Sequence, residues 1–257
     1  MEAIDAILDL VQVQGTVGFI VFLRVGAAMA LFPAFGERTI PERLRLVLAL
    51  AFTAVVAPAL GPEISETLSS GARVFTFLIP EVLIGLAIGI IVRLFIFALQ
   101  TAGSIAAQST SLSQIFGGSA LDPQPAIGHL MLVSGLALAV MTGLHVRLAE
   151  YLILSYDLLP AGQFPDAGIL GQWGIGQIAH SFALAFSLAA PFVIASLIYN
   201  VALGVINRAM PQLMVAFVGA PAITLGGLLL LFLSLPILLG IWSEALTGFL
   251  DNPFRGR

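Results

Sequence analysis

The residues of this sequence that could do chemistry do not form the patterns that catalysis or metal binding requires. The three histidines, His129, His145 and His180, are scattered, with no HExxH pair and no carboxylate at ligand spacing. Segment 117–120, Gly-Gly-Ser-Ala, lacks the GxSxG pattern of an activated serine. Cysteine is absent and every basic residue is arginine, which excludes thiolate chemistry, lysine Schiff bases and P-loops. We therefore predict that the chain is not an enzyme and needs no metal or cofactor.

Three charged residues lie inside apolar stretches, where a charge at a helix centre costs ~2.5–3.5 kcal/mol. These are Arg24, Glu81 and Arg93. Glu81 and Arg93 would be about 18 Å apart along a straight helix and cannot pair with each other. We expect their partners on other segments or on another chain. The alternative, an arginine that extends to the membrane interface, suits Arg93 better than Arg24.

Two sets of small and amide side chains favour contacts between helices. Gly85 and Gly89 form a GxxxG pair, which allows a second helix to approach closely. Asn200, Gly204 and Asn207 share one helical stripe and could bind a neighbouring helix.

Arg208 and Pro211 follow the asparagine stripe and complete the set of predicted subunit contacts. The alternative for this end of the stripe is an ordinary polar turn.

The elements that must position these residues are membrane helices. The chain of 257 residues is 59% hydrophobic and 9% charged, with a mean hydropathy of +1.07. Soluble domains carry roughly 25% charged residues, and a membrane helix needs about 20 apolar ones. The predicted fold class is all-α, a polytopic integral membrane protein with about six hydrophobic runs arranged as helical hairpins broken by proline and glycine. The runs are approximately 15–35, 46–60, 74–99, 127–154, 175–206 and 213–250.

Breaks are expected where proline, glycine and polar residues gather. The pair Gly61-Pro62 opens a predicted loop over 61–73, and residues 100–126 are rich in Gln, Ser, Thr and Gly. Prolines 191, 221 and 236 are expected to divide or kink the last two runs. The acidic N-terminus lacks the basic region of a signal peptide, and the net charge of −4 argues against nucleic acid as a partner.

The order of these signals resembles the FliR/SpaR/YscT family of type III protein-export subunits over about residues 10–250. Near the start the resemblance rests on Phe22, Arg24, Pro33, Phe35-Gly36, Ile40-Pro41, Arg43 and Arg45. In the middle it rests on Glu81, Gly85, Gly89, Arg93, Gln100, Ala102-Gly103, Gln108 and Asp122-Pro123. The most specific block contains Asn200, Val201, Ala202, Leu203, Gly204, Asn207, Arg208, Ala209, Met210, Pro211, Gln212, Gly219 and Pro221. Residues 109–119 depart most from the family pattern.

The resemblance implies an assembly role without catalysis. Members of this family join FliP-like and FliQ-like subunits, and work with FlhB-like and FlhA-like components, in a gate for unfolded substrates. The gate would lie in the bacterial inner (cytoplasmic) membrane, in a flagellar basal body or an injectisome. Residues 1–165 would form a FliP-like portion and 166–257 a FliQ-like helical hairpin portion of a single membrane domain. The membrane charges would then be balanced at contacts between subunits.

In the family, the loop that corresponds to 108–122 is a plug of the closed pore. The resemblance therefore implies pore or plug residues in this stretch, and its alternative is an exposed flexible loop. The candidates are Gln108, Ser111, Ser113, Phe116, Gly117 and Gly118.

A second function class remains open from the residues themselves. Charges inside the membrane and helices broken by proline are also typical of secondary transporters for small solutes. The absence of an inverted repeat and the small number of runs argue against that reading. A membrane scaffold without a pore is a third alternative, and the choice between flagellar and virulence systems stays open.

Overall fold

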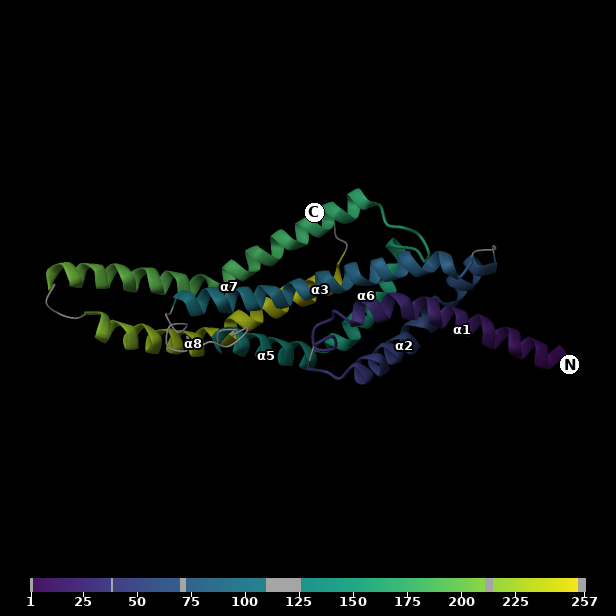
Figure 1. Cartoon of the computed structure of the whole chain (residues 1–257), viewed down its shortest axis with the longest axis horizontal. Helices are drawn as coiled ribbons and strands as arrows, with labels where there is room; N and C mark the ends of the chain where they lie inside the picture. Colours follow the sequence, from purple (N-terminus) through teal and green to yellow (C-terminus); the bar gives the residue numbers. More distant parts are fainter. Residues whose placement is uncertain (1, 38, 70–72, 110–125, 211–214, 254–257) are drawn as a thin grey trace. The chain divides into compact units, whose positions relative to one another are not determined.

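The computed structural model describes residues 2–37, 39–69, 73–109, 126–210 and 215–253, and within these ranges the ordered elements are all helices. Figure 1 shows them in chain order. They are α1 (Glu2–Met29), α2 (Glu42–Ser69), α3 (Phe75–Ser109), α5 (Ala126–Met141), α6 (Leu144–Leu158), α7 (Ala167–Ala209) and α8 (Val215–Asp251). The predicted all-α class is confirmed.

Five helices in the described part of the chain are long and apolar enough to cross a membrane. The pair α5 and α6 would make a sixth span if the two halves count as one. They meet at a bend of 74°, where Gly143 has a φ of +86°, a left-handed conformation that favours glycine. A single unbroken run over 127–154 is therefore corrected to two helices, and the polytopic membrane prediction is confirmed.

Prolines and polar residues interrupt the helices less than the sequence predicts. Helix α2 continues through Pro58 and Pro62 to Ser69, so the predicted loop over 61–73 is wrong for most of its length. Leu60 and Ile64, one turn apart, are both buried, so this part of α2 packs on one face. Packing on that face outweighs the backbone hydrogen bond that a proline cannot donate.

Helix α3 also runs further than its apolar stretch, to Ser109. Ala102 and Ala106 are fully buried, whereas Gln108 is exposed, so the polar composition after residue 99 marks a two-faced helix and not a loop. Helices α7 and α8 pass through Pro191, Pro221 and Pro236 without being divided.

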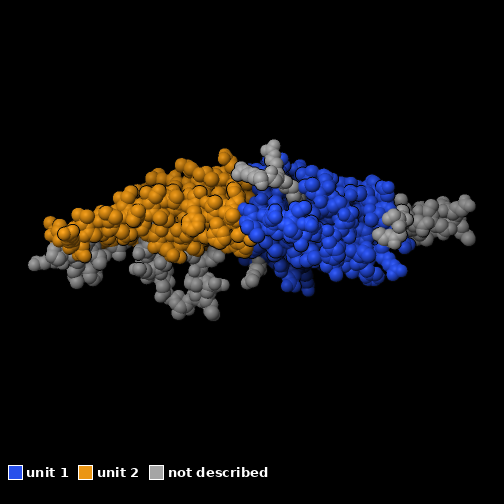
Figure 2. Space-filling model, turned by 90° about the horizontal axis from the view of Figure 1, so that it is seen from above, with its two compact units in different colours: residues 1–94, 142–177, 247–257 blue, residues 95–141, 178–246 orange. Residues whose placement is uncertain are grey.

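The chain forms two compact units that alternate along the sequence, as Figure 2 shows by colour. Unit 1 comprises Met1–Leu94, Thr142–Gln177 and Thr247–Arg257, and unit 2 comprises Phe95–Met141 and Ile178–Leu246. Helices α3, α7 and α8 each contribute to both. The predicted FliP-like and FliQ-like portions divide the chain at another place, near residue 165, and stay a prediction.

Unit 1 is built around α1, which lies against α2 and the first part of α3. Its core includes Phe32, Phe77 and Tyr151, all nearly inaccessible. The end of α8 joins α6 through an ion pair between Asp251 and Arg147. The three charged residues that were predicted to lie inside the membrane all belong to unit 1. They are Arg24, Glu81 and Arg93.

Unit 2 has a core centred on Trp242, which is fully buried. Its indole Nε1 donates a hydrogen bond to the carbonyl oxygen of Phe95 over 2.8 Å. In the same unit the backbones of α3 and α5 approach closely at Gly103 and Gly128. A Cβ added to Gly103 would lie 2.2 Å from the Cα of Gly128, so only glycine fits there.

Candidate functional site

The centre of unit 1 is a buried ion pair between Arg24 of α1 and Glu81 of α3. Arg24 Nε donates to Glu81 Oε2 over 2.8 Å, and Arg24 Nη2 donates to Oε1 over 3.1 Å. Both side chains have 0% exposure. The paired geometry matches the planar guanidinium to the carboxylate and is the strongest form of such a contact.

Helix α6 and the turn after it supply the remaining partners of Arg24. Nη1 donates to Ser155 Oγ over 3.0 Å, and Nη2 donates to the carbonyl oxygen of Leu159 over 2.8 Å. The Cζ atom of Arg24 lies 3.5 Å from the centre of the Tyr156 ring, a cation–π contact. The guanidinium is thus enclosed by groups from one chain.

Glu81 is satisfied in the same way. Tyr156 donates its hydroxyl hydrogen to Oε2 over 3.1 Å, and the backbone N–H of Gly162 donates to Oε1 over 3.0 Å. Gly162 has a φ of +75°, and a Cβ added there would lie 2.8 Å from the ring of Phe77. A glycine is required at this turn both by its backbone and by its neighbour.

The sequence left the partners of these charges on other segments or on another chain. For Arg24 and Glu81 the structure provides partners on other segments of the same chain. The buried ion pair is neutral overall, and its hydrogen bonds connect α1, α3 and the α6–α7 turn. It offers no free group for catalysis.

The GxxxG pair also serves a contact within the chain. A Cβ on Gly85 would lie 2.3 Å from the carbonyl oxygen of Arg24, and one on Gly89 would lie 2.8 Å from the Cβ of Leu31. The helix that approaches these glycines is α1 of the same chain. The close approach at these glycines occurs within the chain, and a contact with a neighbouring subunit there stays a prediction.

Arg93 binds groups at the end of α1 and in the segment after it. Its Nη1 donates to the carbonyl oxygen of Leu31 over 3.2 Å, and its Nη2 lies 3.7 Å from Glu37 Oε2. Both charged side chains are 22–23% exposed. Arg93 therefore sits at the edge of the unit, with a partner that the sequence analysis did not identify.

The predicted stripe on α7 is exposed. Asn200 donates to the carbonyl oxygen of Ser196 over 2.9 Å and to its hydroxyl over 3.2 Å, both one turn earlier. A Cβ on Gly204 would meet nothing within 4 Å. Asn207 and Arg208 are exposed too, and Pro211 lies outside the described residues. The part of the chain that the structure describes does not cover the stripe.

The plug candidates fall mostly outside the described residues. Gln108 is exposed in the last turn of α3. The others, Ser111, Ser113, Phe116, Gly117 and Gly118, are not described.

Sequence reasoning missed most of the buried centre. The missed groups lie at the end of α6 and in the turn after it, and their hydrogen bonds to Arg24 and Glu81 join residues 75 to 135 positions apart in the sequence. They are Ser155, Tyr156, Leu159 and Gly162. No helical periodicity connects positions so far apart. The only signal was that two opposite charges, Arg24 and Glu81, lay in different apolar runs.

Among the described residues, no group of three or more His, Asp and Glu side chains could hold a metal ion. His180 instead lies edge-on to the ring of Phe95, with ring centres 6.5 Å apart.

Comparison with known proteins gives a consistent set of relatives. A family model described as bacterial export proteins, family 1, matches residues 16–249. The flagellar biosynthetic protein FliR of Caulobacter vibrioides is 34% identical over 240 residues, which cover 93% of this chain and 96% of that protein. FliR of Aquifex aeolicus is 30% identical over 84% of both chains, and FliR of Escherichia coli is 28% identical over 84% and 83%.

Proposed function

Because this chain belongs to the FliR family of bacterial export proteins, and is a multi-pass membrane component of the flagellar export apparatus and not an enzyme, we propose that it is a gate subunit. In this role it forms, with FliP-like and FliQ-like subunits, the entry pore for unfolded flagellar proteins. The observation that carries the proposal is the resemblance along nearly the whole chain. Family membership also decides against the secondary transporter that the residues alone left open.

The exposed face of α7 supports a protein partner. Ile194, Leu197 and Val201 are 58–64% exposed, which lipid alone could cover. The amide of Asn200 and the open space at Gly204 are different: the amide nitrogen donates to Ser196 within α7, but lipid offers no donor to the amide oxygen. A second helix that approaches at Gly204 would bring such a partner.

The finer assignments follow from the same resemblance. We place the chain in the bacterial inner membrane at the flagellar basal body, with FlhB-like and FlhA-like components nearby. Residues 1–165 act as the FliP-like portion and 166–257 as the FliQ-like hairpin. Residues 108–122 act as the plug; deletion of 113–119 should raise the ion leak through the assembled complex, and an unchanged leak would contradict a plug.

Co-purification tests the proposed partners. A leucine side chain in place of Gly204 should prevent a second helix from approaching closely. It should not disturb the chain itself, which has open space at this position. We expect Gly204→Leu to lose the FliP-like and FliQ-like proteins from the purified complex and to reduce flagellar export. Gly176→Leu is the matched control, because Gly176 lies on the same helix and also has open space around it.

Equal recovery of both partners with Gly204→Leu and with the wild-type chain would contradict a partner on this face. Solute binding by the purified chain alone, without either partner, would contradict the gate itself.

A further inference from the structure

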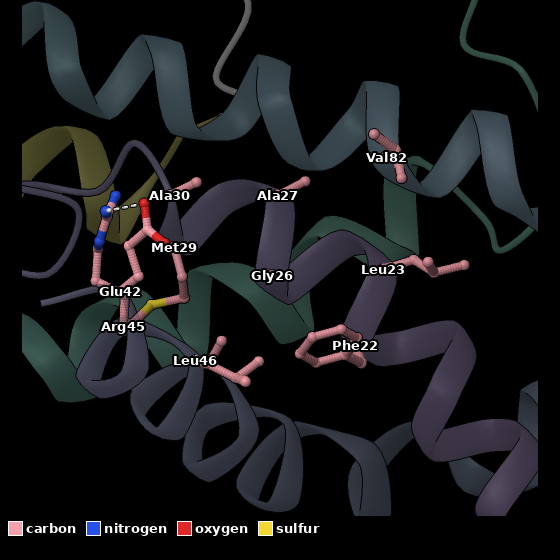
Figure 3. Close-up of a pocket in the computed structure, with 11 residues that line it drawn as sticks. Phe22, Leu23, Gly26, Ala27, Met29, Ala30, Glu42, Arg45, Leu46 and Val82 are labelled. Atoms are coloured by element: carbon pink, nitrogen blue, oxygen red, sulfur yellow. Dashed lines mark ion pairs between the residues drawn. The ribbon is translucent and has the colours of Figure 1, made fainter.

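A groove of about 490 Å³ lies between α1 and α2 in unit 1, as Figure 3 shows. In this view Phe22 of α1 and Leu46 of α2 approach the groove from facing helices. Its lining consists of Phe22, Leu23, Gly26, Ala27, Met29, Ala30, Glu42, Arg45, Leu46, Ala49 and Val82. The lining is therefore apolar except for two charged residues, both from the first turn of α2.

These two charged residues bind each other only weakly. Arg45 Nη2 lies 3.9 Å from Glu42 Oε1, and the side chain of Glu42 is 93% exposed. Such an exposed pair contributes little, so Glu42 does not keep Arg45 from another anion. The side chain of Arg45 is 30% exposed, and Arg43 beside it is exposed as well. Residues 38–45 contain three arginines and one glutamate, a net charge of +2.

The charged end of the groove coincides with the ends of two candidate membrane spans. One span, Gln12–Met29, ends at a lining residue, and the other, Glu42–Leu68, begins at one. The ends of spans lie near the lipid headgroups, while their interiors lie in hydrocarbon. Placed in a bilayer by their length and composition, the two helices would hold the cation of the groove at headgroup level and its apolar walls along the hydrocarbon.

We propose that this groove binds an acidic phospholipid. One acyl chain lies between Phe22 and Leu46, and the phosphate pairs with the guanidinium of Arg45. Basic residues that flank apolar grooves between membrane helices are a recurrent way to bind acidic lipids. The volume lies within the ~300–1,000 Å³ typical of ligand sites. The inference depends on the membrane position of α1 and α2 and not on the partners proposed above.

Native mass spectrometry of the full-length chain tests this site directly. The chain is purified in a mild detergent and titrated with dioleoylphosphatidylglycerol or with dioleoylphosphatidylcholine. We expect the wild-type chain to retain the acidic lipid more strongly. Arg45→Gln should weaken retention of the acidic lipid about fivefold, the effect of one basic residue near an anionic headgroup. Arg43→Gln is the matched control, because Arg43 does not line the groove.

A second pair of variants tests the apolar part. A Cβ on Gly26 would lie 3.5 Å from the Phe22 ring, an ordinary contact, so Gly26→Leu fills the groove without a backbone clash. Gly18→Leu makes the same change on the same helix in open space, outside the groove. We expect Gly26→Leu to reduce binding of the acidic lipid at least as much as Arg45→Gln, and Gly18→Leu to leave it unchanged.

Three outcomes would overturn the proposal. The first is equal retention of the two lipids by the wild-type chain. The second is an equal loss with Arg43→Gln and Arg45→Gln, which would indicate diffuse surface charge. The third is a photo-crosslinker at Leu46, in complexes extracted from membranes, that labels a neighbouring protein and no lipid. Because two unrelated variants are compared with matched controls, failure of one variant to fold still leaves the other to decide.

Discussion

Arg24 and Glu81 lie 57 residues apart in the sequence and form two hydrogen bonds with each other in an environment without solvent. Their pairing places α1 against α3. The hydrogen bond that Leu159 accepts from Arg24 and the one that Gly162 donates to Glu81 attach the α6–α7 turn to the same point. A pair of this kind need not be the most stable filling of its space. It does make each charge depend on the other.

Removal of one charge from this pair should therefore lower the stability of the folded chain more than removal of both charges. Glu81→Gln keeps one acceptor oxygen, for Tyr156 or for Gly162 but not for both, and leaves Arg24 buried and unbalanced, at a cost of ~3–5 kcal/mol. We expect it to lower the midpoint of thermal unfolding in detergent and the yield of folded chain. The double variant Arg24→Met with Glu81→Gln should recover part of the loss.

The comparison is a double-mutant cycle over Arg24→Met, Glu81→Gln and their combination. Strictly additive losses in stability would show that the two charges do not depend on each other.

At Gly85 even the smallest substitution, to alanine, should cause a packing defect. In Gly85→Ala the new methyl group would lie 2.3 Å from the carbonyl oxygen of Arg24 and 2.9 Å from the Cβ of Ala27. Overpacking of this kind costs about 1–3 kcal/mol. Gly18→Ala on α1 meets nothing within 4 Å and should be neutral or slightly stabilising. Thermal unfolding of the two variants should separate them; equal midpoints would contradict the close packing of α1 on α3.

Two glycines with left-handed backbones allow strain and crowding to be separated. Gly143 and Gly162 have φ values of +86° and +75°, so alanine at either position should cost about 1–2 kcal/mol. At Gly143 the added methyl meets nothing within 4 Å, whereas at Gly162 it would lie 2.8 Å from the ring of Phe77. We expect Gly162→Ala to lose more stability, measured by the same unfolding assay. A larger loss in Gly143→Ala would be inconsistent with the buried turn beside Glu81.

The contact between α3 and α5 predicts a local effect in unit 2. Gly103→Ala would place its methyl group 2.2 Å from the Cα of Gly128, so the two backbones must separate. Hydrogen exchange should become faster in the last turns of α3 and the first turns of α5. Gly226→Ala on α8, in open space, is the control and should leave exchange in both helices unchanged. If Gly103→Ala also leaves it unchanged, the close approach of the backbones does not occur.

The sequence by itself determined the class of the protein. Apolar runs longer than a bilayer core requires, in a chain with 9% charged residues, are compatible only with helices that bury or hydrogen-bond their own backbone. It also determined the family, because motifs from Arg24 to the block around Asn207 occur in the family order. Both conclusions depend on composition and linear order, which a sequence records directly.

Helix boundaries were only partly predictable. Pro62 and the polar residues after Leu99 favour breaks by local chemistry, yet α2 and α3 continue through them. Those local preferences are outweighed by the burial of side chains on one face of each helix. These are Leu60 and Ile64 in α2, and Ala102 and Ala106 in α3. Conversely, nothing around Gly143 distinguished the real bend from the many other glycines of the chain.

Only the tertiary structure decided which groups meet. It paired Arg24 with Glu81 and Arg93 with Glu37, and it placed α1 on Gly85 and Gly89. The sequence could state that a buried charge needs a partner, because the cost of an isolated ion is general. It could not say which one, because helical periodicity relates residues a few positions apart, and contacts between helices depend on how the whole unit folds.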